Sequence, residues 1–465
     1  METVRQNKMG TQPIFKLIIS MSLPAMFSML VQSLYNVVDS VFVAQLGEAA
    51  LTAVSLAFPV QTLLIAVAVG TGIGINSLVS RRLGEGRREE ANQAATHGLL
   101  LGAFSWLIFA LLGLFFSRLF FENMTDDLNI IEMGTQYISI ATIFSFGVFI
   151  ELNLEKTLQA TGNMFYPMLF QLVGAVTNIV LDPIFIFGFL FVPAMGVAGA
   201  AIATVIGQIF SMFFSLYIVF KKDHEIHITL KGFRFSWKSV REIYAVGFPS
   251  IIMQSIMALL VFCLNMILIT FSQAAVSVLG VYYKLQSFVF MPVFGLTHGV
   301  MPIMGYNFGA RNKARLLETL KIGCLIALAI MAVGTALFWA IPGPLLQIFN
   351  ASSEMLRVGV GALRTISLCF IPAALGIMFS TLFQAIGRGT SSLFISVLRQ
   401  LVVILPVAYF MAKIGLDYVW LAFPAAEVVS FLASLAIFYW VYRRQLCRLE
   451  KSGEFAEEVR EREPA

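Results

Sequence analysis

The chain alternates between long apolar runs and short polar loops. A helix that spans a bilayer needs about 20 mostly apolar residues. Twelve runs reach that length, near residues 14–43, 51–80, 94–116, 133–154, 166–190, 196–220, 243–270, 276–306, 319–341, 356–386, 390–411 and 418–441. We therefore predict an all-α polytopic membrane protein with twelve transmembrane helices, surrounded by a lipid bilayer.

The composition agrees with a membrane location. Hydrophobic residues make up 58% of the 465 residues and charged residues only 12%, whereas a soluble domain carries about 25% charged residues. The formal net charge of +5 would suggest acidic partners for a soluble protein. Here Lys and Arg lie in loops between apolar runs, so we expect them to orient the chain in the membrane and not to bind nucleic acid.

The basic residues gather in alternate loops. They follow the second, sixth, eighth and twelfth runs, at Arg81, Arg82, Arg87, Arg88, Lys221, Lys222, Lys231, Arg234, Lys238, Arg241, Arg311, Lys313, Arg315, Arg443, Arg444 and Arg448. The loops after the odd-numbered runs are nearly bare of Lys and Arg, with Arg118 and Lys413 as exceptions. Because basic loops stay in the cytoplasm, we predict that both termini are cytoplasmic.

An internal repeat divides the chain into two related halves. One constant shift, which we call the repeat register, superimposes Pro24 on Pro249, the series Gln61, Gly70, Gly74 on Gln286, Gly295, Gly299, then Gly84 on Gly309, and Gln159, Ala160, Gly162 on Gln384, Ala385, Gly387. Six spans return the chain to the same side, so the halves run parallel about an axis near the membrane normal. We predict an N-terminal lobe at 1–220, a cytoplasmic linker at 221–242, a C-terminal lobe at 243–442 and a cytoplasmic tail at 443–465, whose charged part from 450 onwards is expected to be disordered.

Two intramembrane carboxylates are the leading functional candidates, because ionisable groups in a bilayer are costly and usually functional. Gln32, Asn36 and Asp39 share one helix face in the first run. In the fifth run Gln171, Asn178 and Asp182 do the same. Pro183 follows Asp182 and removes a helical N–H, which leaves the Ile179 carbonyl without its usual donor.

Such a cluster has two functional interpretations and one structural one. Burial and mutual repulsion can make one carboxylate carry a proton, or the oxygens can bind a hard cation such as Na⁺. The structural alternative is that each acid is an interfacial or packing residue. The polar series Thr204, Gln208, Ser211 and Ser215 of the sixth run is compatible with hydroxyls that bond a helix backbone.

Other polar or adaptable positions leave their roles open. Glu151 is compatible with an interfacial position, and Lys284 and Glu427 could each face a cavity or pair with a neighbour. Met253 and Met257 belong to a methionine-rich series that could form an adaptable binding wall, although packing explains most methionines.

Several motifs together resemble the multidrug and toxic compound extrusion (MATE) transporters. In the first half these are Ser22-Leu-Pro-Ala25, Tyr35-Asn-Val-Val-Asp39, Val79-Ser-Arg-Arg-Leu-Gly84 and Gln159-Ala-Thr-Gly-Asn163; in the second half they are Gln286-Ser-Phe-Val-Phe-Met-Pro292 and Gly305-Tyr-Asn-Phe-Gly-Ala310. The resemblance covers nearly the whole chain. It is closest to the bacterial DinF/MepA-like branch, because the runs 243–270 and 356–386 lack the acids that the NorM-type branch carries there.

The resemblance implies two six-helix lobes that form a V and export cationic, amphiphilic drugs by alternating access, in exchange for H⁺ or Na⁺. It assigns ion coupling to Asp39, Asn178, Asp182 and Thr204, with Na⁺ at the first three if sodium is the ion. It assigns helix bending to Pro24, and Pro183 is a second candidate. We expect the substrate cavity to involve Gln32, Tyr35, Asn36, Gln61, Gln171, Gln208, Met253, Met257 and Gln286.

The remaining expectations follow from this assignment. The chain is expected to be a monomeric, multi-pass protein of a bacterial plasma membrane, with no cofactor besides the coupling ion and no enzymatic activity. A lipid-linked oligosaccharide flippase of the same superfamily is the alternative, which the scarcity of intramembrane Lys and Arg disfavours. A membrane-embedded enzyme is a third reading, but no nucleophile–base pair or metal constellation supports it.

The chemistry of the two halves differs although their scaffold repeats. In the repeat register, Asn36 and Asp39 meet Val261 and Leu264. Likewise Asn178 and Asp182 meet Val403 and Val407. Ion coupling is therefore predicted to reside in the first lobe.

Overall fold

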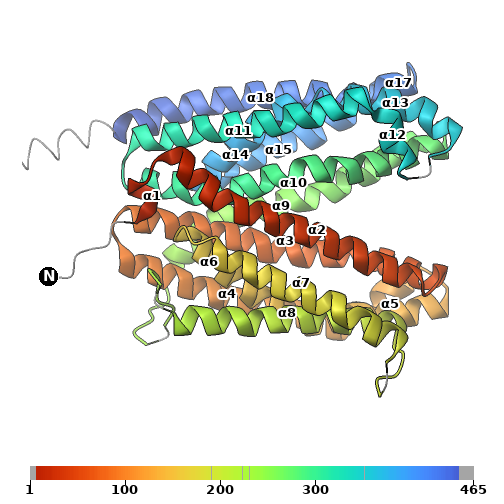
Figure 1. Ribbon diagram of the computed structural model, residues 1–465, viewed down its shortest axis with the longest axis horizontal. Helices are drawn as coiled ribbons and strands as arrows, with labels where there is room; N and C mark the ends of the chain where they lie inside the picture. Colours follow the sequence, from red (N-terminus) through yellow and green to blue (C-terminus); the bar gives the residue numbers. More distant parts are fainter. Residues whose placement is uncertain (1–6, 190, 223, 230, 350, 450–465) are drawn as a thin grey trace, which may run out of the picture. The chain divides into compact units, whose positions relative to one another are not determined.

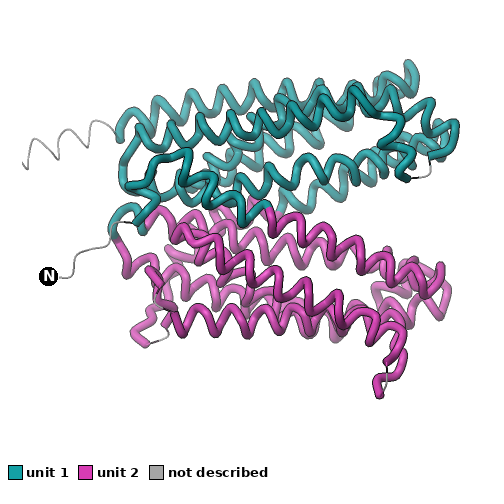
Figure 2. Tube along the Cα trace, in the orientation of Figure 1, with its two compact units in different colours: residues 1–26, 83–86, 252–465 teal, residues 27–82, 87–251 magenta. Residues whose placement is uncertain are grey.

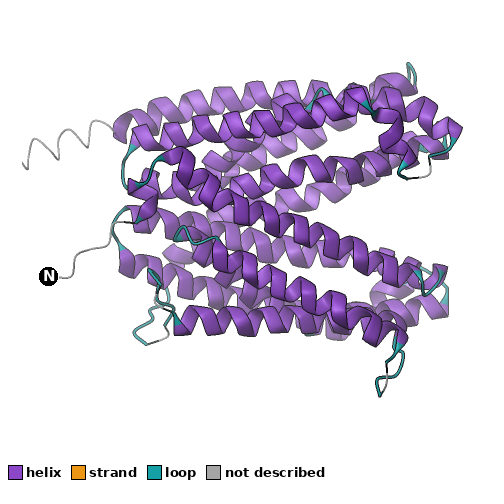
Figure 3. Cartoon of the chain, in the orientation of Figure 1, coloured by secondary structure: helices purple, strands orange, loops and turns teal. Residues whose placement is uncertain are grey.

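The protein is helical throughout the part that the structure describes. This computed structural model describes residues 7–189, 191–222, 224–229, 231–349 and 351–449. Within these ranges the β structure is limited to one isolated bridge between Phe189 and Val192. The predicted all-α class is confirmed (Figure 3).

The helices follow one another along the chain with short connections (Figure 1). The first half contains α1 (Lys8–Thr11), α2 (Ile14–Ala44), α3 (Glu48–Gly84), α4 (Arg88–Glu122), α5 (Leu128–Ile143), α6 (Phe146–Ala160), α7 (Phe165–Phe187) and α8 (Gly196–Lys221). The second half contains α9 (Trp237–Leu268), α10 (Gln273–Gly309), α11 (Lys313–Ala340), α12 (Pro342–Gln347), α13 (Ser353–Ser367), α14 (Phe370–Ala385), α15 (Gly389–Val397), the π-helix η1 (Leu398–Ile404), α16 (Leu405–Ala412), α17 (Leu416–Val419), α18 (Ala422–Val441) and the π-helix η2 (Tyr442–Leu446).

The described helices account for all twelve predicted spans. Ten segments are long and apolar enough to cross a membrane, and two further spans are bent pairs, α5 with α6 at 44° and α13 with α14 at 46°. The sequence predicted each pair as one continuous helix. A break in a helix leaves backbone carbonyls without their usual donors. In each pair a tryptophan of the preceding span supplies a donor: Trp106 Nε1 donates to the Ile143 carbonyl, and Trp339 Nε1 donates to the Arg364 carbonyl.

The chain forms two compact units (Figure 2). Unit 1 contains residues 1–26, 83–86 and 252–465, and unit 2 contains residues 27–82 and 87–251. The first predicted span of each half is therefore divided: α2 changes unit after Met26, and α9 changes unit after Ile251. These two residues are equivalent in the repeat register, so the division itself obeys the repeat. The predicted tail from residue 450 lies outside the described residues.

The repeated glycines hold the divided helices in place. Within unit 2, a Cβ at Gly74 of α3 would meet the Ile243 carbonyl of α9. Within unit 1, a Cβ at the equivalent Gly299 of α10 would meet the Ser22 side chain and backbone of α2. Small residues allow helix backbones to approach closely in a membrane, where packing and not the hydrophobic effect joins helices. The glycine landmarks of the sequence repeat are thus explained by backbone contact.

Replacing Gly74 by valine should destabilise unit 2. The added side chain would overlap the α9 backbone, and overpacking of this kind costs about 1–3 kcal/mol. The expected result is a lower Tm and a smaller monodisperse fraction of purified protein. Gly280→Val is the matched control, because a Cβ at Gly280 meets nothing within 4 Å; equal losses in both variants would contradict the packing argument.

The described part of the predicted linker is fixed to α4. His97 of α4 accepts a hydrogen bond from the Ser236 N–H through Nε2 at 2.8 Å. The ring of His97 lies 4.6 Å from that of Phe233. Asn92, one turn earlier on α4, accepts from the His227 N–H at 2.9 Å. The segment between the halves is therefore packed on unit 2 at these positions.

Candidate functional site

Polar side chains from five helices of unit 2 meet in one cluster. They are Tyr35 and Asp39 from α2, Gln61 from α3, Tyr137 from α5, Asn178 and Asp182 from α7, and Thr204 from α8. Six of these seven were predicted as site residues. We call this set the Asp39–Asp182 cluster.

Asn178 is the centre of the hydrogen bonds in the cluster. Its Nδ2 donates to Asp182 Oδ1 at 3.2 Å and to Thr204 Oγ1 at 3.1 Å. Asn178 and Asp182 lie one turn apart on α7, whereas Thr204 comes from α8. The two helices approach closely because Gly207 of α8 faces the Gly174 carbonyl of α7.

Two tyrosines extend the cluster to the other helices. The side chain of Tyr35 lies near that of Thr204 and within electrostatic range of both Asp39 and Asp182. The hydroxyl of Tyr137 accepts a hydrogen bond from Gln61 Nε2 at 2.7 Å. Both carboxylates also lie within electrostatic range of each other. A change of charge at either carboxylate therefore changes the electrostatic potential at the other members of the cluster.

Three oxygens of the cluster are shielded from solvent and have no hydrogen-bond partner. They are Asp39 Oδ1, Asn178 Oδ1 and Asp182 Oδ2, and the Asp182 side chain is fully buried at 0% exposure. A buried acceptor without a donor is costly. A proton would turn a carboxylate into a donor, and a hard cation would take the same oxygens as ligands.

The described residues contain no group of three or more His, Cys, Asp or Glu side chains that could hold a metal ion. A cation at the Asp39–Asp182 cluster would therefore depend on two carboxylates supplemented by the neutral oxygens of Asn178 and Thr204. This donor set suits a monovalent hard cation better than a transition metal, which prefers nitrogen or sulfur ligands.

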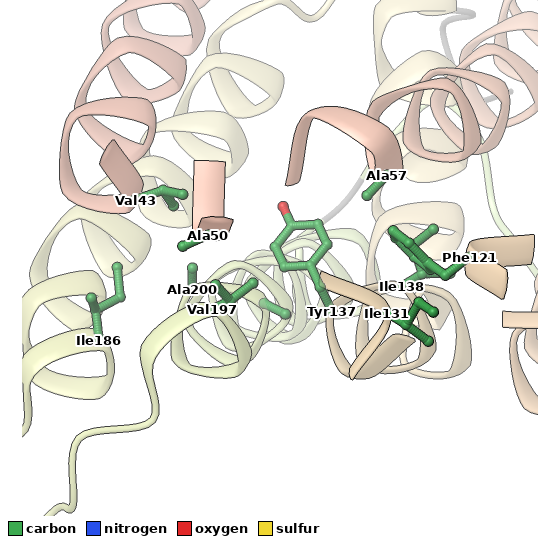
Figure 4. Packing of buried hydrophobic residues seen from close by; sticks show 11 residues of the cluster. Val43, Ala50, Ala57, Phe121, Ile131, Tyr137, Ile138, Ile186, Val197 and Ala200 are labelled. Carbon is green, nitrogen blue, oxygen red and sulfur yellow. The ribbon is translucent and has the colours of Figure 1, made fainter. Parts of the chain in front are cut away.

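An apolar layer closes one end of the cluster. Val43, Ile186 and Ala200 lie one turn beyond Asp39 and Asp182 and one turn before Thr204, and all three are buried. Figure 4 shows them in one buried hydrophobic group with residues of α3, α4 and α5. Packed side chains therefore border the Asp39–Asp182 cluster on this side.

The remaining predicted site residues lie elsewhere. Gln171 is on α7 but bonds Glu155 and not the Asp39–Asp182 cluster. Gln32 and Asn36 are exposed on α2, and Gln208 is half-buried one turn from Thr204. Met253, Met257 and Gln286 belong to unit 1. Helices α2 and α7 continue through Pro24 and Pro183, so their roles as bends stay predictions.

Sequence reasoning missed one tyrosine and one buried ion pair, and it left a second ion pair open. Tyr137 belongs to the Asp39–Asp182 cluster. The only feature of the sequence that could have indicated this was its polar hydroxyl within an apolar run. Glu155 and Lys156 form a buried pair at 2.9 Å, which the sequence analysis did not propose. Their spacing from Glu151, one turn away, was the available signal.

The third feature is a pair in unit 1. Arg399 Nη1 donates to Glu427 Oε1 at 3.0 Å. Of the two interpretations of Glu427, a cavity-facing residue or a paired one, the structure shows the pair. Arg399 lies in η1. Pro406 follows shortly after the end of η1, and because proline has no backbone N–H it cannot donate a helical hydrogen bond. π-Helical segments often occur at functional sites. Lys284 lies over the Phe349 ring, 5.8 Å from its centroid.

Replacing Tyr137 by phenylalanine should lower the stability of the folded protein. It removes the acceptor of the Gln61 amide and leaves that amide without this partner, at a cost of about 1–3 kcal/mol. We expect a lower Tm of purified protein with the helix content unchanged. Tyr217→Phe serves as the control, because Tyr217 is exposed on α8; an identical Tm for wild type and Tyr137→Phe would show that the bond contributes nothing.

Comparison with known proteins agrees with this fold. The chain is 26% identical over 434 residues to the multidrug export protein MepA of Staphylococcus aureus (strain MRSA252), covering 92% of this chain and 94% of that protein. A solved structure described as the outward-facing conformation of a multidrug resistance MATE family transporter of the MOP superfamily is 29% identical, with a TM-score of 0.89, and covers 97% of this chain and 100% of that one. A structure of a MOP superfamily transporter from Pyrococcus furiosus, whose description states that reverse polarity of its binding pocket suggests a different function, matches with the same values.

The family match reproduces the internal repeat. The family model described as MatE matches residues 24–184 and 249–410. The two stretches begin at Pro24 and Pro249, the first landmarks of the repeat register. Among the described residues, ten single helices and two bent pairs are long and apolar enough to cross a membrane. The chain is a multi-pass membrane transporter that belongs to the MatE family, with relatives in the MepA-like branch that its motifs predicted.

Proposed function

We propose that this transporter is a multidrug exporter of a bacterial plasma membrane, which exchanges cationic amphiphilic compounds for H⁺ or Na⁺. The observation that carries the proposal is the set of unpartnered, shielded oxygens on Asp39, Asn178 and Asp182. A transporter needs a site that is satisfied only while its coupling ion is bound. These oxygens, with Thr204 beside them, meet that requirement. The name of the MepA relatives supports drug export as the activity.

The Asp39–Asp182 cluster couples the two cargoes through its charge. With both carboxylates ionised, the cluster attracts a positively charged drug. When the cluster takes up H⁺ or Na⁺, part of its negative charge is neutralised and the attraction for the drug falls. Linkage makes the effect reciprocal, so the bound drug weakens binding of the ion by the same factor.

The thermodynamic drive depends on how many ions are exchanged. One monovalent drug exchanged for one monovalent ion moves no net charge, so only the ion's concentration gradient contributes, at about 1.4 kcal/mol per tenfold. Each additional ion adds its own gradient and about 2.3 kcal/mol per 100 mV of membrane potential. A dependence of efflux on membrane potential would therefore report more than one ion per drug.

Efflux of a fluorescent cationic dye from proteoliposomes tests the proposal. A pH gradient and a Na⁺ gradient are applied separately, with an anionic dye of similar size as the control for substrate charge. We expect one of the two gradients to drive the cationic dye and neither to drive the anionic dye. Efflux of the cationic dye that ignores both gradients would overturn ion coupling, and preferential efflux of the anionic dye would overturn the substrate class.

A further inference from the structure

A second group of polar side chains is buried in unit 2, around α6. Glu155 is 0% exposed, Lys156 3%, Gln159 4% and Glu151 7%. Glu151, Glu155 and Gln159 are spaced by one turn and share one face of α6. None of the seven residues of the Asp39–Asp182 cluster belongs to this group, which we call the Glu151–Glu155 group.

Glu155 is fully supplied with donors. Its Oε1 accepts from Lys156 Nζ at 2.9 Å and from Gln159 Nε2 at 2.7 Å. Its Oε2 accepts from Gln171 Nε2 at 2.9 Å. A carboxylate with a paired cation and two amide donors is stable in its ionised form. Glu155 and Lys156 therefore form a neutral pair.

Glu151 is the second carboxylate of the group, and Lys156 already pairs with the first, Glu155. It lies one turn before Glu155, where two like charges repel each other, and its Oε1 is shielded from solvent without a hydrogen-bond partner. The charged side chains that act on Glu151 are Glu155 and Lys156, both on α6. Among the described residues, the neighbouring helices contribute uncharged groups to the Glu151–Glu155 group, namely Gln171 from α7, Ser211 from α8 and Asn76 from α3.

A proton on Glu151 would answer both of these features. It would remove the charge that repels Glu155, and it would supply a donor at a buried carboxyl whose Oε1 has no hydrogen-bond partner.

We propose that Glu151 is a second proton-carrying carboxylate of unit 2, separate from the Asp39–Asp182 cluster. Binding one proton converts the charged carboxylate of Glu151 to a neutral carboxyl. Release of that proton restores a second negative charge one turn from Glu155. The proton is the ligand, because Lys156 already supplies the cation of the group.

The position of the group connects this proton to the first cluster. Gln171 lies on α7, the helix that carries Asn178 and Asp182. Asn178 lies seven positions after Gln171, which corresponds to about 10 Å along a helix. A change of charge at Glu151 acts on Glu155, whose Oε2 accepts from Gln171. The change is therefore transmitted to α7 two turns from the cluster, on the side away from the apolar layer of Val43, Ile186 and Ala200.

Infrared difference spectroscopy of the purified, reconstituted transporter tests this assignment during a pH titration. We expect a carboxylic-acid C=O band that is lost in Glu151→Gln and retained in Glu122→Gln, whose carboxylate is exposed beside Arg118. The Asp39→Asn variant should keep the Glu151 band as well. A spectrum of Glu151→Gln identical to that of wild type would overturn the proposal, as would loss of the band on adding Na⁺ at constant pH.

A stability measurement accompanies the spectra. Glutamine has the shape of a protonated glutamate, so Glu151→Gln should keep the wild-type Tm; a marked loss of Tm would count against a protonated Glu151.

This inference rests on the proposed function only for the use of the proton in transport. If dye efflux ignores every gradient while the Glu151 band is present, ion coupling fails and the carboxyl assignment stands. If Asp39→Asn abolishes efflux but Glu151→Gln leaves the spectrum unchanged, only the present inference fails.

Discussion

Replacing Asp39 by asparagine is expected to abolish gradient-driven efflux, with dye export from cells falling to the level of cells without the transporter and no loss of protein in the membrane. The substitution keeps the size and polarity of the side chain but removes one of the two charges of the Asp39–Asp182 cluster. The cluster then no longer gains a proton or cation at this position, so the gradient cannot be used. The measurement is dye efflux from energised cells, normalised to the amount of transporter in the membrane.

Asp127→Asn is the matched control for that experiment. Asp127 is an exposed carboxylate that caps α5, and asparagine can accept the same bonds from Asn129 and Ile130. Its efflux should equal that of wild type. Full efflux by Asp39→Asn would contradict coupling at the cluster, whereas equal losses in both variants would indicate a general effect of removing acidic residues.

Replacing Lys156 by methionine is expected to destabilise the protein strongly. Glu155 would keep its two amide donors but lose its cation while remaining fully buried. Removing one partner of a buried ion pair costs about 3–5 kcal/mol. We expect a large drop in the Tm of purified protein and a poor yield of monodisperse transporter.

The double variant Glu155→Gln with Lys156→Met separates the lost pair from lost packing. Because removing both charges leaves no uncompensated ion, the double variant should recover most of the Tm lost by Lys156→Met. The exposed pair of Arg118 and Glu122 is the control, since Arg118→Gln should leave the Tm unchanged. A double variant as unstable as Lys156→Met would assign the effect to packing of the lysine stem on Gly72.

The arrangement of spans could be predicted from the sequence because a bilayer permits few structures. Each backbone polar group must be satisfied within its own helix, so a long apolar run indicates a span directly. The repeat register was visible because glycine and proline have specific backbone roles. The breaks at Phe144–Ser145 and Leu368–Cys369 could not be predicted in the same way, because their carbonyls are satisfied by tryptophans from other helices.

The Asp39–Asp182 cluster was accessible to sequence reasoning for a different reason. Acids are rare in apolar runs, and the helical spacing of Asn178 and Asp182 places them on one face. Tyr137 was not predicted, because a tyrosine in a span is compatible with packing, lipid contact or hydrogen bonding. Only the tertiary contact with Gln61 distinguishes these roles.

The pairing within the Glu151–Glu155 group could not be predicted from the sequence. Glu151, Asn153, Glu155 and Lys156 follow one another closely, and such polarity usually marks the end of a span. In the structure all four side chains are buried, because Lys156, Gln159 and Gln171 supply the donors that Glu155 requires. Gln171 comes from another helix, so the compensation could not be seen along the chain.

Drug-dependent ion movement in proteoliposomes tests the central claim most directly. Purified transporter is reconstituted without any ion gradient, a cationic dye gradient is imposed, and entry of H⁺ or Na⁺ is followed as dye leaves. If the Asp39–Asp182 cluster couples the ion to the drug, wild-type protein moves the ion against the dye and so does Asp127→Asn, whereas Asp39→Asn and Asp182→Asn do not. Ion movement by Asp39→Asn and Asp182→Asn at the wild-type rate would contradict ion coupling at this cluster.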